Sequence, residues 1–396
     1  MNIKNIVCFT VVTATTFLGG CTASKVKAQS QPKIVATHNI ICDLVQTIAQ
    51  ETIDLTCLIE GDQDPHTYRP TPSQRKAIEE AQLILYGGYQ LESRIIKLFA
   101  ESEIPKLPLY ENAVMEPIQT KHSDGHGEAE GHSDADGHSD TEAHSDADGH
   151  SDADGHSDAE EHGEAEGHSE AEGHSDAEEH GEAEGHSEVE GHSDAEEHGE
   201  AEGHSEAEGH SEELEPDPHV WHNVENTVAM VEILRDLFLQ ANPVAADIYL
   251  KNSVDLTDNL WSLDGWIKEQ IATIPEGQKF LVTNHNSLNY YAQAYRLEDY
   301  KSLTGLSSED SPTAADIGNL AEKIRQAGIP TIFAESTVND RVISNVASTA
   351  DVELSESKLF VDGLGTTNNY AEMMAHNTCA IVDGLGGKCK PFKAAK

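Results

Sequence analysis

The chain has 396 residues and a formal net charge of −47 at pH 7, a balance that argues against nucleic acid as a partner because no basic patch offsets it. The charge is concentrated, since residues 121–213 hold 34 acidic residues and one basic residue, a net of −33 that leaves −14 for the rest. Roughly 280 residues of ordinary composition remain outside this segment and the first twenty residues, enough for two domains.

The N-terminus carries an apolar run from Ile6 to Leu18. A run of this length is too short for a stable membrane span and is typical of a secretory signal, which we assign to residues 1–20. The signal ends in Leu18-Gly19-Gly20-Cys21, which resembles the lipobox before the lipid-modified cysteine of bacterial lipoproteins. We expect a lipid anchor at Cys21 and a polar tether over residues 21–32; the alternative is a plain signal peptide with an incidental cysteine.

From residue 33 onward, short apolar runs alternate with stretches of helical period. The runs Ile34-Val35-Ala36 and Leu83 to Tyr86 predict buried strands, and the stretches Ile40 to Gln50 and Leu91 to Ala100 predict helices. Strands that alternate with helices predict a parallel sheet covered on both faces. We therefore expect an N-terminal α/β lobe over residues 33–242, interrupted by an insert at 121–213.

The insert is a repeat in which histidine occupies every sixth position from His126 to His210. It has neither a helical nor a strand period and almost no large apolar side chains. Such a segment cannot offset its ordering entropy, so we expect a disordered loop rather than a third domain. Three roles are open for it: a low-affinity collector of metal ions, which we favour because imidazoles and carboxylates bind metals, a sensor of metal sufficiency, or a passive solubilising loop.

The second half of the chain repeats the α/β rhythm after a long helical segment. Pro243 opens that segment, and apolar residues at near-helical spacing continue it to Ile274. Beyond it we expect strands at Phe280-Leu281-Val282, Thr331 to Ala334 and Leu359-Phe360-Val361, and helices over Thr313 to Gln326, Val338 to Ala350 and Asn369 to Gly384. The predicted architecture is two α/β lobes, 33–242 and 275–396, each with a parallel sheet covered by helices, joined by one long rigid helix over 243–274.

Four cysteines lie outside the signal and its lipobox: Cys42, Cys57, Cys379 and Cys389. An exported chain permits disulfides, and four cysteines allow three connectivities. Proximity in the sequence favours Cys42 with Cys57 and Cys379 with Cys389. Zinc ligation by these cysteines is less favoured, because the sequence contains no CxxC pair.

Four residues that can bind a metal lie on loops beside predicted strands or helices. His66 and His285 each follow a predicted strand, His219 precedes a predicted helix, and Asp362 follows Leu359-Phe360-Val361. Open α/β sheets bind ligands at the loops that follow their strands. Zinc takes about four N, O or S ligands, and imidazole is its usual neutral ligand.

The other histidines outside the insert have blander interpretations. His38 ends the first predicted strand, and we expect a structural residue there or one that borders the ligands. His222 should lie on a solvated helix face, and His376 should be a surface or structural residue. The aromatic residues near the candidate ligands are expected to form walls of the site: Trp221, Tyr68 and Tyr290.

Five separated motifs, in this order, resemble the metal-binding solute receptors of bacterial ABC importers, the cluster A-I group and especially its ZnuA-like members. They are Gly61 to Pro72, Gly87 to Glu92, Asp217 to Trp221, His285 to Tyr291 and Asp362-Gly363-Leu364-Gly365. The resemblance runs from Lys33 to Gly384 apart from the insert. Many zinc-type members of this group carry an insert rich in histidine and acidic residues before the second ligand, where this chain has its own.

The resemblance implies that His66 and His219 from the N-terminal lobe, with His285 and Asp362 from the C-terminal lobe, hold a metal in the interlobe cleft. Manganese-type relatives have Glu at the third position, and imidazole suits zinc better than manganese. The expected protein is a monomeric receptor that is not an enzyme. It would lie on the periplasmic or extracellular face of a bacterial membrane and pass Zn²⁺ to a membrane permease and its ATPase.

Three alternatives accompany this hypothesis. The first is a manganese receptor of the same architecture, and the second is a metal-storage or adhesin lipoprotein whose function is the insert. An exported zinc hydrolase is disfavoured, because the sequence lacks HExxH and four protein ligands leave no open position for catalysis.

Deletion of residues 121–213 should lower the number of zinc ions bound per chain but leave one tight site. Because imidazoles become charged below about pH 6 and then stop binding metal, the full chain should bind fewer zinc ions at about pH 5 than at about pH 7.5. Metal analysis after equilibrium dialysis of both forms at both pH values measures this. Equal stoichiometry at the two pH values would contradict the collector role.

Overall fold

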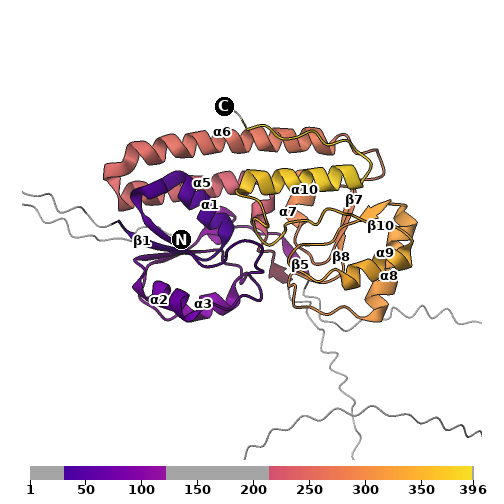
Figure 1. Cartoon of the computed structure of the whole chain (residues 1–396), viewed down its shortest axis with the longest axis horizontal. Helices are drawn as coiled ribbons and strands as arrows, with labels where there is room; N and C mark the ends of the chain where they lie inside the picture. Colours follow the sequence, from indigo (N-terminus) through magenta and orange to yellow (C-terminus); the bar gives the residue numbers. More distant parts are fainter. Residues whose placement is uncertain (1–30, 122–213, 395–396) are drawn as a thin grey trace, which may run out of the picture. The chain divides into compact units, whose positions relative to one another are not determined.

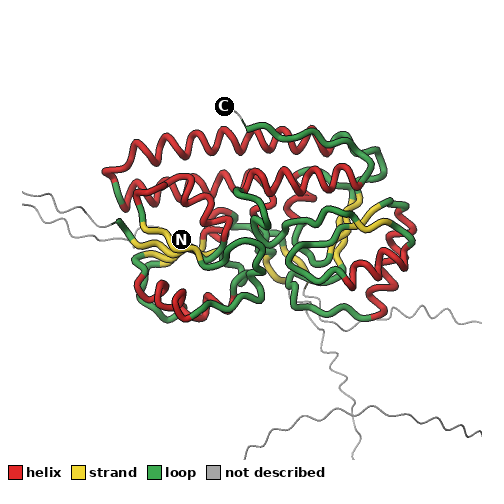
Figure 2. The backbone as a smooth tube through the Cα atoms, viewed as in Figure 1, coloured by secondary structure: helices red, strands yellow, loops and turns green. Residues whose placement is uncertain are grey.

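Two α/β lobes make up the part of the chain that the structure, a computed structural model, describes: residues 31–121 and 214–394 (Figures 1 and 2). The expected signal peptide, most of the expected tether and nearly all of the histidine-rich insert lie outside these residues. Within the described residues, no helix is both long and apolar enough to cross a membrane.

The N-terminal lobe is built on four parallel strands in the order β2-β1-β3-β4. Their bounds are β1 (Lys33–Ala36), β2 (Asp54–Cys57), β3 (Leu83–Tyr86) and β4 (Lys106–Pro108). Successive side chains of a strand point to opposite faces. Ile34 and Ala36 accordingly pack in the cluster that contains α1 (Asn39–Ala49), and Val35 packs with α2 (Pro72–Glu80) and α3 (Ser93–Phe99). Helices thus cover both faces of the sheet, as predicted (Figure 1).

The two chain segments that flank the insert pair with each other. Strand β5 (Gln119–Lys121) runs antiparallel to β6 (Leu214–Pro216), and Lys121 lies opposite Leu214. Between β4 and β5 lies the short helix α4 (Leu109–Ala113), and after β6 comes a 3₁₀ turn, η3 (Val220–His222). Because the two ends of the insert are adjacent, a short turn can replace it without strain on the lobe.

Two long helices follow η3: α5 (Val224–Ala241) and α6 (Ala246–Ile271). The sequence predicted one helix over 243–274; the structure has a 3₁₀ turn, η4 (Pro243–Ala245), before α6. Leu260, Leu263 and Ile267 line the buried face of α6. This helix packs against α1 of the N-terminal lobe and against α10 (Tyr370–Gly384) of the C-terminal lobe, so it contacts both lobes.

The C-terminal lobe contains two parallel strand pairs, β7 (Phe280–Thr283) with β8 (Asp299–Ser302) and β9 (Thr331–Ile332) with β10 (Glu353–Leu354). The Phe333 amide donates to the Val282 carbonyl (3.0 Å) and links the two pairs. The helices of this lobe, besides α10, are α7 (Asn289–Ala294), α8 (Ala314–Ala327) and α9 (Arg341–Ala350).

One predicted strand, Leu359 to Val361, is wrong. The structure has only an isolated parallel bridge there, between Glu335 and Leu359. The side-chain amide of Asn377 explains the difference, because its oxygen accepts from the Phe360 amide (2.8 Å) and its nitrogen donates to the Phe360 carbonyl (2.7 Å). Both backbone groups that would continue a ladder are already bonded to α10.

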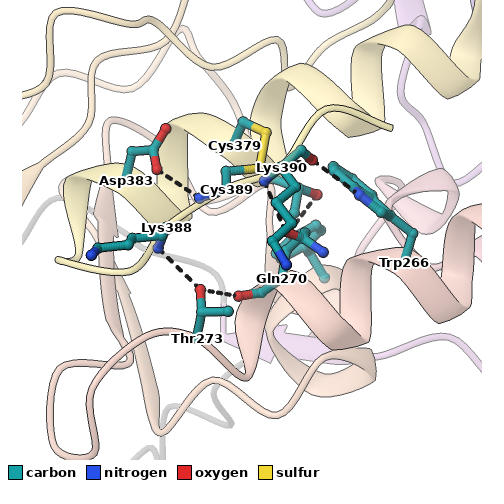
Figure 3. The surroundings of a disulfide bond; sticks show 10 residues. Trp266, Gln270, Thr273, Cys379, Asp383, Lys388, Cys389 and Lys390 are labelled. Carbon is teal, nitrogen blue, oxygen red and sulfur yellow. Dashed lines mark hydrogen bonds between the residues drawn. A yellow bond between two sulfur atoms is a disulfide. The ribbon is translucent and has the colours of Figure 1, made fainter. Parts of the chain in front are cut away.

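Both disulfides favoured by sequence proximity are present and confirm that prediction: Cys42–Cys57 and Cys379–Cys389. The first joins α1 to β2, and the second joins α10 to the segment that follows it. Figure 3 shows how this segment binds α6 and the turn after it: Lys388 N donates to Thr273 Oγ1 (3.1 Å), Lys390 N to Gln270 Oε1 (2.9 Å), and Trp266 Nε1 to the Lys390 carbonyl (3.1 Å).

The double substitution Cys379→Ser/Cys389→Ser should lower the free energy of unfolding by about 3 kcal/mol, because the bridge restricts the unfolded chain over a loop of this length. Urea unfolding followed by circular dichroism measures the change. The substitution of Cys42 and Cys57 provides a matched comparison, since that bridge closes a loop of 15 residues instead of 10. An unchanged unfolding free energy in both variants would contradict the expectation.

Candidate metal centre

The structure brings the four sequence-predicted residues together. His66 lies on the loop after β2, His219 directly before η3, His285 after β7, and Asp362 just beyond the bridge at Leu359. Their potential ligand atoms all lie within 4.8 Å of one another. The side chains of His219, His285 and Asp362 are at most 1 % exposed, and that of His66 is 8 % exposed. His219 lies 153 positions from His66 and 66 positions from His285 in the sequence, yet all three converge between the two lobes.

The spacing of these atoms fits one small ion. His219 Nε2 lies 3.3 Å from His66 Nε2 and 3.4 Å from His285 Nε2. Asp362 Oδ1 lies 3.3 Å from His285 Nε2 and 3.7 Å from both other Nε2 atoms. A tetrahedral zinc ion with bonds of about 2.0–2.1 Å separates its ligand atoms by about 3.3 Å. The four atoms therefore surround a point that can hold such an ion.

The chemistry of the donors also favours a cation at this point. Asp362 Oδ1 is buried and has no hydrogen-bond partner among the described residues, although three imidazole nitrogens surround it. Its other oxygen, Oδ2, accepts from the Thr337 hydroxyl. A buried carboxylate oxygen without a donor is costly, and a cation that binds both the oxygen and the imidazole lone pairs removes that cost.

Two further carboxylates fix the orientation of the histidine rings. His219 Nδ1 donates to Asp217 Oδ1 (2.8 Å), and His285 Nδ1 donates to Glu335 Oε2 (2.6 Å). In each ring this bond keeps a proton on Nδ1, so that Nε2, once it is deprotonated, presents its lone pair to the site. Asp217 and Glu335 are both fully buried.

Asp217 and Glu335 were not predicted as functional residues. A local signal for the first was present: Asp-Pro-His occurs twice, at 64–66 and at 217–219. In both copies the Asp side chain accepts from the backbone amide of the His two residues later, at 2.8 Å for His66 and 2.9 Å for His219. Glu335 lies 50 residues from His285 in the sequence and had no local signal.

Burial and the nearby carboxylates act in opposite directions on the histidines of the candidate site. Burial is the main cause that lowers the pKa of His66 to about 3, so this ring is a neutral imidazole. Burial also lowers the pKa of His285, but the carboxylates of Glu335 and Asp362 outweigh it and hold that pKa well above its usual value. The same balance, with Asp217 and Asp362, raises the pKa of His219.

The loop that carries His66 is bonded to the C-terminal lobe. Ser308 Oγ donates to Asp64 Oδ2 (2.5 Å), and Ser336 Oγ donates to Asp62 Oδ1 (2.5 Å). Arg94, on α3 of the N-terminal lobe, also forms an ion pair with Glu309 of the C-terminal lobe. These contacts join the two lobes around the site.

The remaining histidines differ in part from expectation. The prediction of a solvated His222 is wrong, because the ring is fully buried and its Nε2 donates to the Val361 carbonyl (2.8 Å). Burial lowers its pKa to about 3. His38 is buried and borders the ligands, with Nε2 2.9 Å from the Asp362 carbonyl. His376 is half-buried and bonds the Lys358 carbonyl (2.9 Å).

The predicted aromatic walls also lie near the ligands. The Trp221 ring is fully buried, with its centroid 5.4 Å from that of His219. The Tyr290 hydroxyl contacts the Asp217 carbonyl (3.4 Å). The Tyr68 hydroxyl bonds the Leu58 carbonyl (2.8 Å), at the base of the loop that carries His66.

Relatives of known sequence resemble the chain over most of its length. The manganese-binding lipoprotein MntA of Halalkalibacterium halodurans is 24 % identical over 360 residues, which cover 89 % of this chain and 88 % of the relative. The manganese ABC transporter substrate-binding lipoprotein PsaA of Streptococcus anginosus is 26 % identical over 374 residues, 93 % and 94 % of the two chains.

Solved structures share the fold. The periplasmic zinc-binding protein TroA of Treponema pallidum matches with a TM-score of 0.63 and 21 % identity over 90 % of this chain and 99 % of its own. The Fe(III)-bound YtgA of Chlamydia trachomatis matches with a TM-score of 0.62 and 19 % identity, over 90 % and 99 % of the two chains.

A family model settles the relationship. The ZnuA model, described as zinc-uptake complex component A, periplasmic, matches residues 34–384, which is most of the chain. The family consists of substrate-binding receptors of metal importers rather than enzymes. The sequence motifs, the two-lobe fold and this match together place the chain in the ZnuA family of metal-binding receptors.

Proposed function

We propose that this protein is a zinc receptor that delivers its ion to the membrane permease and ATPase of an ABC importer. The main observation in support of zinc is the set of donor atoms, in which three imidazole nitrogens and one carboxylate oxygen converge in a buried position. Zinc is commonly bound in tetrahedral sites of nitrogen and oxygen ligands. Imidazole ligands also favour zinc over manganese. In this proposal His66, His219, His285 and Asp362 are the four ligands.

Manganese is the second candidate, because several relatives carry manganese in their names. Manganese prefers oxygen ligands and ranks lowest in affinity among the divalent first-row metals. A site with one carboxylate and three imidazoles is therefore expected to bind manganese less tightly than zinc. The donor set supports zinc, and the names of the relatives support manganese.

We further propose that the receptor is a monomer held by lipid on Cys21 at the outer side of a bacterial membrane, with its cargo between lobes 33–242 and 275–396. Relatives named as lipoproteins support the anchor. Tethering raises the effective concentration of the receptor at the permease. The insert would serve as an accessory that collects zinc at low affinity.

A metal competition experiment tests the choice of ion. The protein without residues 122–213, closed by a short turn between β5 and β6, should bind one zinc ion at least about 100-fold more tightly than manganese. His285→Glu should narrow that ratio, because it exchanges a nitrogen ligand for a harder oxygen ligand. Competition against a chromogenic chelator gives both dissociation constants.

Two outcomes of the competition would count against the proposal. A preference of the unsubstituted protein for manganese would overturn the zinc assignment but leave the receptor in place. Loss of all tight binding after the deletion would overturn the receptor function and favour storage by the insert.

The carboxylates behind the ligand histidines give an independent test. Asp217→Asn and Glu335→Gln should each weaken zinc binding about 10–100-fold, because each removes the charge that holds a ring in the metal-binding tautomer. Asp383→Asn is the matched control: its carboxylate also accepts a backbone amide, that of Cys389 (2.8 Å), but contacts no candidate ligand. Isothermal titration calorimetry measures the three affinities, and equal losses in all three variants would contradict a specific role.

A further inference from the structure

We propose that two buried histidines of the N-terminal lobe, His38 and His222, are positioning residues that set the place of the Asp362 carboxylate for metal capture. This inference rests on the proposed function, since it takes Asp362 to be a ligand. It assigns the geometry of a C-terminal-lobe ligand to residues of the opposite lobe.

The two imidazoles bond consecutive carbonyls of the chain at Asp362. His222 Nε2 lies 2.8 Å from the Val361 carbonyl oxygen, and His38 Nε2 lies 2.9 Å from the Asp362 carbonyl oxygen. A carbonyl can only accept, so in both rings Nε2 carries the proton and donates it. Both rings are fully buried, and they come from the bend after β1 and from η3, 184 positions apart in the sequence.

Each ring is itself held in place. The Tyr110 hydroxyl lies 2.6 Å from His38 Nδ1 and donates to it, which fixes the tautomer that bonds Asp362. The His222 ring lies against Trp221, with centroids 5.4 Å apart. His222 Nδ1 has no hydrogen-bond partner among the described residues. Within this part of the chain, the ring therefore makes its hydrogen bond through Nε2, to Val361.

Further contacts from α1 bind the chain that follows Asp362. The Leu364 amide donates to Asn39 Oδ1 (3.2 Å), and the Tyr370 amide donates to Asp43 Oδ2 (2.8 Å). A Cβ on Gly363 would lie 2.6 Å from the Asn39 side chain, so only glycine permits this approach. The segment from Val361 to Tyr370 is thus bonded to the N-terminal lobe at Val361, Asp362, Leu364 and Tyr370.

These bonds control the orientation of the Asp362 carboxylate, a side chain that can rotate. Asp362 must keep Oδ1 aimed at three imidazoles, and its backbone is not fixed by a strand at this point, since the bridge ends at Leu359. The bonds from His38 and His222 replace the missing ladder. Loss of either would leave a buried carbonyl without a donor and allow the carboxylate to shift, and partners behind metal ligands typically contribute 10–100-fold to affinity.

His376 offers a matched control on the same stretch of chain. Its Nε2 bonds the Lys358 carbonyl (2.9 Å), four residues before Asp362, and its ring stacks on Phe360 with centroids 4.4 Å apart. It is an imidazole-to-carbonyl bond of the same kind, but it comes from α10 of the C-terminal lobe and holds no residue of the site.

The experiment compares His38→Leu, His222→Leu and His376→Leu with the unsubstituted chain. Zinc dissociation constants come from chelator competition, dissociation rates from stopped-flow mixing with excess chelator, and metal-free stability from urea unfolding. We expect His38→Leu and His222→Leu to raise the zinc dissociation constant about 10–100-fold, mainly through faster release. His376→Leu should lower stability and leave the dissociation constant within threefold.

Conservative variants and a double-mutant cycle separate positioning from folding. His38→Gln and His222→Gln keep a donor near the Nε2 position, so they should recover most of the affinity and also serve if the leucine variants do not fold. In an Asp362→Asn background, where the carboxylate is already lost, His38→Leu should weaken zinc binding much less than it does in the unsubstituted chain if His38 acts through Asp362.

Two results would overturn the inference. The first is a dissociation constant within threefold of the unsubstituted value in the leucine variants of His38 and His222. The second is full additivity of His38→Leu with Asp362→Asn. Failure of the proposed function looks different, since the unsubstituted chain and His376→Leu would then also lack tight zinc binding.

Discussion

The fully buried carboxylate of Asp362 is the constraint on which the rest of the site depends. One of its oxygens, Oδ1, makes no hydrogen bond among the described residues and faces the Nε2 atoms of three histidines. Burial of an unpaired charge costs several kcal/mol unless a partner of opposite charge joins it. A divalent ion provides that partner and binds the imidazole lone pairs at the same time, so the arrangement favours capture of a cation over any reaction.

The fold supplies this arrangement through the ends of its parallel strands. His66 and His285 follow strands of different lobes, and the carboxyl ends of such strands are where open α/β sheets gather ligands. Behind the candidate ligands, Asp217 and Glu335 fix the orientation of the rings of His219 and His285. The rings therefore need little reorganisation when an ion arrives, which is how a receptor can bind tightly without metal-driven folding.

The histidine-rich insert is the most visible feature of the sequence, yet specific binding is better explained elsewhere. Its two flanks close against each other in the β5–β6 pair. The four candidate ligands all lie outside it, and the bonds from Asp217 to His219 and from Glu335 to His285 come from the two lobes. The candidate site and the insert are therefore made of separate parts of the chain. The family match extends over the lobes on both sides of the insert.

Features that depend on neighbours along the chain could be predicted from the amino-acid sequence. Alternating apolar runs and helical stretches predicted the two α/β lobes, short cysteine separations predicted both disulfides, and family motifs identified the four residues that converge. Which groups lie behind these four residues depends on how distant parts of the chain pack together. Glu335 reaches His285 across 50 residues, His222 reaches Val361 across 139, and His38 reaches Asp362 across 324. Those contacts leave no periodic trace in the sequence, because each is made by a single polar side chain whose burial is set by the packing of the two lobes.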